Sequence, residues 1–402
     1  MRMSETPWLT VIGLGENGPD GLCPAALAAL ASAEVVIGPP RHLALLPDLQ
    51  AEPIAWPVPF AQGIERLKSL RGRQVVALAS GDPFWFGAGA VIARHFTPGE
   101  WRAIPGPSVF SLVAAHLGWP LEQTLCLGLH AQPMTRLRPY LAPGERAIVL
   151  LRDGSAVASL ADYLADMGFG ASRLWVCEAM GGPRQQITEG LAEDIGGSFS
   201  HPVCVAIAME GPAQAALPKT SGLADDLFES DGVMTKRPAR ALTLSALAPR
   251  AGEHLLDIGG GSGSISVEWA LAHPRCRATT IEGRADRIGL IAANARAFGV
   301  ENRIEIIEGQ LPEALCDLDP PDVIFVGGGL SAELLQTLLA EFVPGTRLVI
   351  NAVTLEAEML LAAWQAEQGG ELLRVELAQA LPLGSRRGWK SAYPLVQWSG
   401  TL

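Results

Sequence analysis

The chain has 402 residues, and 49% of them are hydrophobic. A chain of this length predicts roughly two to three domains, each with enough apolar residues for its own core. The formal net charge of −12 argues against nucleic acid as the main partner, because binding to phosphates requires a basic surface.

Neither a membrane span nor a signal peptide is recognisable. No apolar run approaches the length of a membrane span, and residues 1–8 lack the apolar core of a signal peptide. The six cysteines are scattered without Cys-x-x-Cys spacing, which favours buried, reduced thiols over a metal site. They are Cys23, Cys126, Cys177, Cys204, Cys276 and Cys316. We therefore expect a cytoplasmic protein without a metal.

The first predicted strand, residues 8–14, runs into a glycine loop. Residues 13–18 satisfy the dinucleotide pattern Gly-x-Gly-x-x-Gly in letters. However, Pro19 and Pro24 prevent a helix from beginning at the loop, as phosphate binding requires. The next strand, residues 34–38, also lacks the acidic residue that would bind a ribose. The pattern is therefore weak support for a dinucleotide site.

Two further loops follow predicted parallel strands. The apolar strand 74–79 opens into Ser80-Gly-Asp-Pro83, and a short strand leads to Pro105-Gly-Pro-Ser108 and an amphipathic helix ending at Leu117. Both loops lie at the carboxyl ends of strands, where α/β sheets bind ligands. An ordinary turn would explain either loop by itself.

Residues 120–210 predict a second α/β half. Its strands are expected near 124–128, 146–151, 173–177, 185–189 and 203–209, with helices between them. Residues 211–234 combine Gly, Pro and an acidic cluster with little periodicity, which is typical of a linker. We expect another domain, residues 235–402, that folds by itself.

The glycine-rich stretch of this last domain is its most informative feature. Residues 255–258 predict a buried strand, 259–263 a turn, and 264–271 the beginning of a helix, which together place backbone N–H groups at a helix N-terminus. Such loops bind dinucleotides or S-adenosylmethionine (SAM). The dinucleotide pattern fails, because serine stands where its third glycine is needed. The next strand ends in Glu282, which suits ribose hydroxyls in either class.

Several features downstream suggest contacts with a substrate. The strand 321–326 opens into Gly327-Gly-Gly329, and three glycines at a strand end permit close approach of a bulky planar molecule. The loop 382–390 appears exposed and carries three cations. Three more cations lie in the first turn of a helix that begins near Pro238, where they could be a solvated surface or a substrate clamp.

These motifs resemble two families of SAM-dependent methyltransferases. Asp257-x-Gly-x-Gly-x-Gly followed by Glu282 is similar to motif I and the acidic strand end of class I enzymes. Four segments have the order and spacing of the tetrapyrrole methylase family, whose members are class III enzymes. They are Val11-Ile-Gly-Leu-Gly15, Ser80-Gly-Asp-Pro83, Pro105-Gly-Pro-Ser108 and Glu178-Ala-Met-Gly-Gly182. The match departs at the first loop, where many members have Gly-x-Gly-Pro-Gly.

The resemblance implies an α/β chain with two SAM sites. Residues 1–210 would form a two-lobed tetrapyrrole methylase fold, with lobes of about 1–118 and 119–210, and residues 235–402 a Rossmann-like class I methyltransferase fold. The N-terminal SAM would contact Gly13, Gly15, Gly81, Asp82, Ser108 and Met180. The C-terminal SAM would contact Thr235, Asp257, Gly259, Gly261, Gly263, Glu282 and Gln310.

A class III half followed by a class I half resembles the bifunctional precorrin methyltransferases of aerobic cobalamin biosynthesis. That resemblance implies methylation of ring carbons 5 (N-terminal domain) and 15 (C-terminal domain) of a reduced precorrin, and loss of the acetate carboxyl on ring carbon 12. The substrate carries many carboxylates, so cations near the cofactor are expected to bind it. The candidates for substrate binding are Lys236, Arg237, Arg240, Gly328, Arg386, Arg387 and Lys390.

Two other functions are weighed against this one. A SAM- or tetrapyrrole-binding protein with only one active domain would need a degraded glycine loop in the other, and neither loop is degraded. A nicotinamide oxidoreductase using residues 13–18 is disfavoured by the prolines that follow. No catalytic side chain is indicated. We expect a homo-oligomer whose partner is the polycarboxylate substrate.

Overall fold

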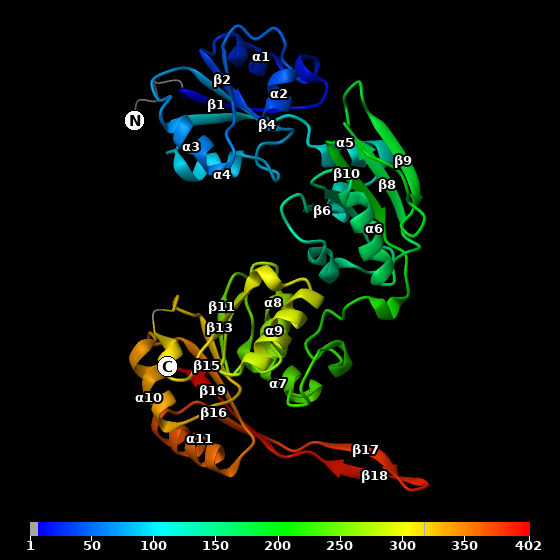
Figure 1. Cartoon of the computed structure of the whole chain (residues 1–402). Coiled ribbons are helices and arrows are strands. Elements are labelled where there is room, and N and C mark those ends of the chain that lie inside the picture. The colour runs from blue at the N-terminus through cyan, green and yellow to red at the C-terminus, as the bar shows by residue number, and fades with distance from the viewer. Residues whose placement is uncertain (1–6, 317) are drawn as a thin grey trace. The chain divides into compact units, whose positions relative to one another are not determined.

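The computed structural model describes residues 7–316 and 318–402. The chain forms two compact units. The N-terminal unit consists of the residues up to 133 together with 142–215, and the C-terminal unit of 134–141 together with 216–402. Figure 1 shows both, coloured along the chain.

The first lobe of the N-terminal unit is a parallel five-stranded sheet in the order β3-β2-β4-β1-β5. Its strands are β1 (Leu9–Leu14), β2 (Val35–Gly38), β3 (Glu52–Ala55), β4 (Val75–Ser80) and β5 (Trp101–Ile104). Its helices are η1 (Gly18–Gly21), α1 (Pro24–Ala31), α2 (Pro40–Ala44), α3 (Ala61–Lys68) and α4 (Gly89–His95). Val11 and Ile12 belong to different core clusters, because neighbouring residues of a strand face opposite sides of the sheet.

The second lobe is a mixed five-stranded sheet in the order β6-β7-β10-β8-β9, in which only β6 and β7 are parallel. Its strands are β6 (Leu125–Gly128), β7 (Arg146–Leu150), β8 (Arg173–Glu178), β9 (Gln186–Leu191) and β10 (Val203–Ala208). Its helices are α5 (Val109–Leu117), η2 (Leu121–Gln123) and α6 (Ala156–Asp166). All five strands were predicted from the sequence to within about three residues.

The C-terminal unit contains a seven-stranded sheet in the order β13-β12-β11-β14-β15-β19-β16, with β19 antiparallel to both its neighbours. The strands are β11 (His254–Ile258), β12 (Arg277–Glu282), β13 (Ile304–Glu308), β14 (Val323–Val326), β15 (Arg347–Ala352), β16 (Glu371–Val375) and β19 (Leu395–Thr401). The helices are α7 (Arg237–Leu247), α8 (Ser264–Ala272), α9 (Ala285–Ala297), α10 (Ala332–Glu341) and α11 (Leu355–Gln368). Helices α7 to α9 cover one face of the sheet, and α10 and α11 cover the other (Figure 1).

The stretch 211–234 is not a free linker. Leu217, Leu223, Phe228 and Met234 are buried in the core of the C-terminal unit, together with residues of α7, α8 and α9. The stretch forms short 3₁₀ turns, η4 (Ala213–Ala215) and η5 (Asp225–Leu227), and no regular helix or strand. Its buried residues are therefore irregularly spaced, and the sequence shows no periodicity there.

A short helix that lies in the N-terminal part of the sequence also belongs to the C-terminal unit. It is η3 (Met134–Tyr140), which packs against α9. The Thr135 hydroxyl donates to Glu301, and the Lys219 ammonium donates to the carbonyl of Pro139 at 2.6 Å. Leu137 is completely buried.

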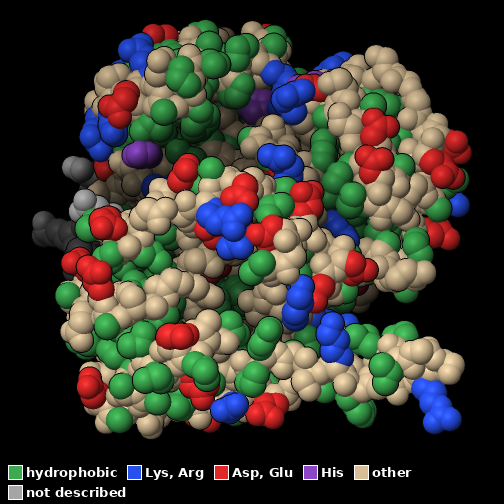
Figure 2. Space-filling model, turned by 60° about the horizontal axis from the view of Figure 1, so that its bottom comes forward, with side chains coloured by type: hydrophobic (Ala, Val, Ile, Leu, Met, Phe, Trp, Pro, Cys, Tyr) green, Lys and Arg blue, Asp and Glu red, His purple; other side chains and the backbone are tan. Residues whose placement is uncertain are grey.

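The exposed loop expected at 382–390 is instead part of a hairpin, formed by β17 (Ala378–Leu383) and β18 (Arg386–Ser391). The hairpin pairs as a separate two-stranded sheet and projects from the C-terminal unit (Figure 1). It carries hydrophobic and cationic side chains (Figure 2), among them Trp389, which is 78% exposed.

Some expectations about single side chains were wrong. Cys23 and Cys316 are exposed, whereas Cys177, Cys204 and Cys276 are buried. Within the described part of the chain, no helix is both long and apolar enough to cross a membrane.

Candidate active sites

Three loops of the first lobe meet because their strands are neighbours in the order β4-β1-β5. The N–H of Gly81 donates to the carbonyl of Leu14 at 3.0 Å, and the N–H of Gly106 donates to the carbonyl of Gly81 at 3.1 Å. A Cβ added to Gly13 would lie 1.8 Å from the Gly81 carbonyl oxygen. Gly13 therefore allows the backbones to touch, and any larger residue would separate the loops.

A cavity of about 650 Å³ opens beside these loops, within the N-terminal unit. It is lined by residues of both lobes, and five of the six predicted cofactor residues are among them. These are Gly15, Gly81, Asp82, Ser108 and Met180. Gly13, the sixth, contributes the close packing behind the loop. The first helix after the Gly13–Gly18 loop is a 3₁₀ turn, and α1 begins only at Pro24, as predicted from the prolines.

A cluster of polar residues in this cavity was missed by the sequence analysis. The Arg41 guanidinium pairs with Glu16, and Arg184 reaches the same carboxylate at 3.1 Å. Beside them, the ring of His42 lies 3.1 Å from the Ser80 hydroxyl. Burial, and then the charge of Arg41, lower the pKa of His42 to about 4, so this ring is neutral at pH 7. No spacing in the sequence marks these residues, because they come from four separate parts of the chain.

The glycine loop of the C-terminal unit joins β11 to α8. Gly259, Gly261 and Gly263 all have positive φ, at 77°, 58° and 75°. A Cβ on Gly259 would lie 2.9 Å from the backbone nitrogen of Gly328, so the two glycine runs are in close contact. A Cβ on Gly261 would meet only the carbonyl oxygen of Val233, at 3.9 Å. The loop is therefore tight at Gly259 and open at Gly261.

Asp257 lies beneath this loop, one residue before the end of β11. Its side chain is buried, and one carboxylate oxygen accepts from the Ser266 hydroxyl at 2.6 Å. The other oxygen, Oδ1, has no hydrogen-bond partner among the described residues. Burial raises the pKa of Asp257 to about 6, although its bonds to Ser266 oppose the rise. A buried acceptor without a partner is uncommon, and a bound water or a ligand would supply the donor that it lacks.

Glu282 ends β12 next to the same loop. One of its oxygens accepts from the N–H of Gly261 at 2.8 Å, and the other from the N–H of Arg284 at 3.0 Å. The amide nitrogen of Gln310 donates to the carbonyl of Gly283 at 3.2 Å. The structure thus brings the predicted residues Glu282, Gln310 and the three alternating glycines to one edge of the sheet.

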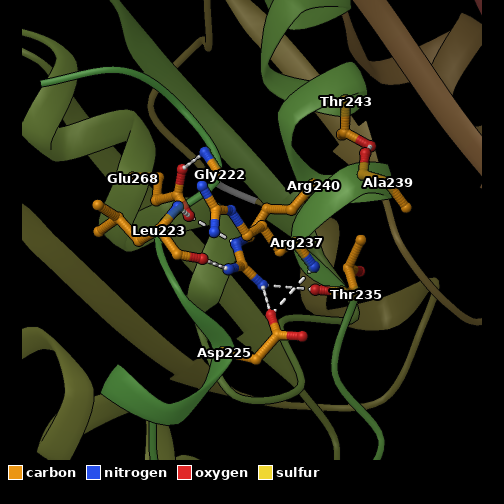
Figure 3. A network of polar contacts seen from close by, with 9 residues as sticks. All are labelled: Gly222, Leu223, Asp225, Thr235, Arg237, Ala239, Arg240, Thr243 and Glu268. Carbon is orange, nitrogen blue, oxygen red and sulfur yellow. Dashed lines mark hydrogen bonds and ion pairs between the residues drawn. The ribbon is translucent and has the colours of Figure 1, made fainter. Parts of the chain in front are cut away.

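The predicted substrate residues do not form one group. Lys236 and Arg237 are exposed where α7 begins, and Gly328 adjoins the glycine loop. The prediction for Arg240 is wrong, because its side chain is fully buried and pairs with Glu268 at 2.6 Å (Figure 3). Arg240 follows Arg237 by three residues and lies on the face of α7 that is turned to the core.

The remaining three cations, Arg386, Arg387 and Lys390, lie on the hairpin strand β18. The hairpin leaves the sheet between Val375 at the end of β16 and Leu395 at the start of β19. Both residues lie level with Ala352, the last residue of β15, and so at the carboxyl edge of the sheet, where the glycine loops also lie.

Comparisons with known proteins cover both halves of the chain. Residues 9–196 match the family model described as tetrapyrrole (corrin/porphyrin) methylases, and residues 226–402 match the precorrin methyltransferase domain. A cobalt-precorrin-6B C(15)-methyltransferase (decarboxylating) of Salmonella typhimurium is 32% identical over 178 residues, which are 42% of this chain and 91% of that protein.

One solved structure is the C-terminal domain of precorrin-6Y C5,15-methyltransferase from Rhodobacter capsulatus. It is 52% identical, with a TM-score of 0.45, and covers 46% of this chain and 100% of its own. A precorrin-6Y C(5,15)-methyltransferase (decarboxylating) of Sinorhizobium sp is 44% identical over 400 residues, which are 98% of this chain and 97% of that protein. The chain therefore belongs to the precorrin-6Y C(5,15)-methyltransferase (decarboxylating) family.

Proposed function

We propose that each of the two domains binds its own SAM, and that the domains divide the reaction. The N-terminal domain methylates ring carbon 5 of a reduced precorrin. The C-terminal domain methylates ring carbon 15 and removes the carboxyl of the acetate on ring carbon 12. The observation that carries the proposal is the presence of two separate glycine-loop sites, one in each unit. The relative from Salmonella typhimurium, named for C(15) methylation and decarboxylation only, has about the length of the C-terminal domain.

The residues of the C-terminal site suit SAM. The unpartnered Asp257 oxygen can accept from a ligand, and the open side of Gly261 lets a ligand reach the backbone. Glu282 presents a carboxylate to ribose hydroxyls at the end of β12. SAM supplies a methyl group on a sulfonium, which is a strong leaving group. These residues bind and orient it, and alignment of the two reactants is the main catalytic contribution we expect.

The N-terminal cavity suits a polycarboxylate macrocycle beside a cofactor. Trp85 and Phe86 form an aromatic wall, with ring centres 5.2 and 5.8 Å from that of Phe110. Arg41 and Arg152 also line the cavity and can receive carboxylates, because a guanidinium presents two parallel donors. Arg41 is held in place by Glu16.

Decarboxylation fits the C-terminal site without an additional catalytic group. Attack of ring carbon 15 on the methyl group leaves a conjugated iminium on the macrocycle. The electrons of the breaking C–C bond can then flow to the iminium nitrogen as carbon dioxide leaves. Both events should occur in one pocket, because addition of water to the iminium, or loss of a proton from it, would otherwise remove the electron acceptor. The side-chain carbon that has lost its carboxyl then takes a proton from solvent and becomes a methyl group. Gly328, with no atom near its added Cβ, leaves space there for a planar ring.

Product analysis of two disabled enzymes tests the division. Gly261→Arg blocks the C-terminal site, and Gly81→Arg with Asp82→Ala blocks the N-terminal one. The first enzyme should give at most one added methyl with every carboxyl retained. The second should give one added methyl and loss of carbon dioxide, measured by mass spectrometry. Gly345→Arg and Gly99→Arg are matched controls, since both glycines have positive φ and open surroundings. Decarboxylated product from Gly261→Arg would refute the proposal.

A further inference from the structure

The segment 222–236, which precedes α7, is held by three buried polar side chains from three different helices. They are Arg240 of α7, Glu268 of α8 and Asn294 of α9, with exposed fractions of 0%, 5% and 1%. Figure 3 shows Arg240 at the centre of the first part of this network, surrounded by backbone and side-chain acceptors. No feature of the sequence marked these residues as related.

Arg240 and Glu268 fix the two ends of the segment (Figure 3). The Arg240 guanidinium donates to the carbonyl of Thr235 at 2.6 Å, to Asp225 at 3.0 Å, and to the carbonyl of Leu223. Glu268 accepts from the N–H of Leu223 at 3.0 Å and from the N–H of Gly222 at 2.6 Å. The planar guanidinium therefore determines where Thr235 lies relative to α8.

Asn294 links the same segment directly to the glycine loop. Its amide oxygen accepts from the N–H of Glu229 at 2.8 Å. Its amide nitrogen donates to two carbonyls, those of Glu229 and of Ser262 in the loop, both at 2.8 Å. One side chain thus satisfies both backbone groups of Glu229 and holds it against the loop.

Residues 229–235 lie on the open side of this loop. The carbonyl oxygen of Val233 is the atom that a Cβ on Gly261 would meet, at 3.9 Å. Val233 is 66% exposed although it is hydrophobic. Asp231 pairs with Arg287 of α9 at 2.9 Å, on the same side. The segment therefore borders the space that Gly261 leaves for a ligand.

A buried ion pair is a weak source of stability, because desolvation of both charges offsets their attraction. Its geometry, however, is restrictive: Arg240 must meet several acceptors at once. A role limited to stability would be met equally well by apolar side chains of similar volume. The network is better explained by a need to hold one backbone segment in one place.

We propose that residues 229–235 form one wall of the SAM site in the C-terminal domain, and that Arg240, Glu268 and Asn294 are positioning residues for this wall. The inference rests on the proposed SAM binding by this domain. It assigns to the wall the side of the ligand next to Gly261. The three positioning residues act through the backbone and do not touch the ligand themselves.

Calorimetric SAM titration of the full-length chain tests the wall, with the second site identified as the one lost in Gly261→Arg. Asn294→Asp keeps the acceptor for the N–H of Glu229 but removes the donor to the carbonyls of Glu229 and Ser262. Arg240→Lys keeps the charge but not the set of donors. Each variant should weaken SAM at the second site at least tenfold, raise KM for SAM more than it changes kcat, and accelerate amide exchange at 229–235.

The matched control is Arg347→Lys. Arg347 makes a comparable network in the same domain, to Glu253 at 2.7 Å and to the carbonyl of Leu247 at 3.1 Å, and its side-chain bonds to described residues do not include the glycine loop. This variant should lose melting temperature and keep its affinity for SAM. A loss of SAM affinity in this control as large as that in Asn294→Asp or Arg240→Lys would overturn the inference.

The inference would also be overturned if Asn294→Asp and Arg240→Lys kept the SAM affinity within twofold. This result would be clearest if amide exchange at 229–235 accelerated, because the segment would then be loosened without an effect on SAM. A wild-type chain with a single SAM site would instead refute the proposed function, and the wall with it. The two failures are distinguished by the wild-type titration alone.

Discussion

The carboxylate of Glu282 accepts a hydrogen bond from the backbone N–H of Gly261 at 2.8 Å, while its other oxygen accepts from the N–H of Arg284 at 3.0 Å. The acid at the end of β12 therefore has a structural role in addition to the proposed contact with a ribose. It fixes the middle of the glycine loop relative to the next strand.

Glu282→Gln tests this double role. An amide offers only one acceptor oxygen, so one backbone N–H loses its partner, at a cost of about 1–3 kcal/mol. We expect SAM affinity at the C-terminal site to fall about tenfold, a factor that corresponds to about 1.4 kcal/mol. Glu305→Gln, at an exposed position of the edge strand β13, is the control and should leave the affinity unchanged. Equal affinity in both variants would show that Glu282 does not organise the site.

Two alanine substitutions in the glycine loop should have different consequences. Gly259 and Gly261 both have positive φ, so each alanine costs about 1–2 kcal/mol in backbone strain. Only the Cβ at residue 259 would also press on backbone, at 2.9 Å from the nitrogen of Gly328. Gly259→Ala should therefore lower the melting temperature of the C-terminal domain further than Gly261→Ala, as measured by calorimetry. Equal losses of melting temperature would indicate that the backbone of Gly327–Gly329 moves aside at little energetic cost.

The boundary of the C-terminal domain lies earlier than residue 235. A fragment 235–402 would lack Leu217, Leu223, Phe228 and Met234, all of which are in the core. Loss of each large buried side chain typically costs about 2–5 kcal/mol, and a domain has only about 5–15 kcal/mol to lose. We expect 216–402 to show a cooperative melting transition and 235–402 to show none. A folded 235–402 fragment would contradict this account of the core.

The sequence was most informative where function requires special backbone conformations. Gly259, Gly261 and Gly263 repeat at alternate positions, and each has the positive φ that such a pattern predicts. The positions of β1, β4 and β11 along the chain were also predicted, since buried parallel strands are nearly continuous apolar runs.

Residues that act through tertiary contacts were not predicted from the sequence. Arg240 seemed an exposed cation because the sequence does not show which face of α7 is turned inward. Asn294, Glu16 and His42 carry no motif, and only folding brings them to their loops. The stretch 211–234 seemed a linker because its buried residues follow no regular period.

The N-terminal domain should lose stability in mild acid through His42. Burial lowers the pKa of the folded-state His42 to about 4, whereas an unfolded chain binds this proton near pH 6.5. Between these values the unfolded state binds more protons, so the free energy of unfolding falls as pH falls, by about 3 kcal/mol in total. His42→Gln should flatten this part of the profile, measured by denaturant titration between pH 7.5 and 4. An unchanged slope would contradict a buried neutral ring.

Asp257 should give the C-terminal domain the opposite response. Its folded-state pKa is raised to about 6 by burial and, further, by the nearby charge of Glu282, whereas an unfolded Asp titrates near 3.8. Between these values the folded state binds more protons, so the free energy of unfolding increases as pH falls from about 6 to 4. Above pH 6 the free energy of unfolding is about 3 kcal/mol lower than it is below pH 4. Asp257→Asn removes the buried charge and should raise the melting temperature at pH 7.5. The amide oxygen keeps the bond from Ser266, so an N–H donor replaces the unpartnered acceptor and SAM affinity should fall. Higher stability together with lower affinity would show that the buried charge is kept for binding, and a variant that is less stable at pH 7.5 would contradict this.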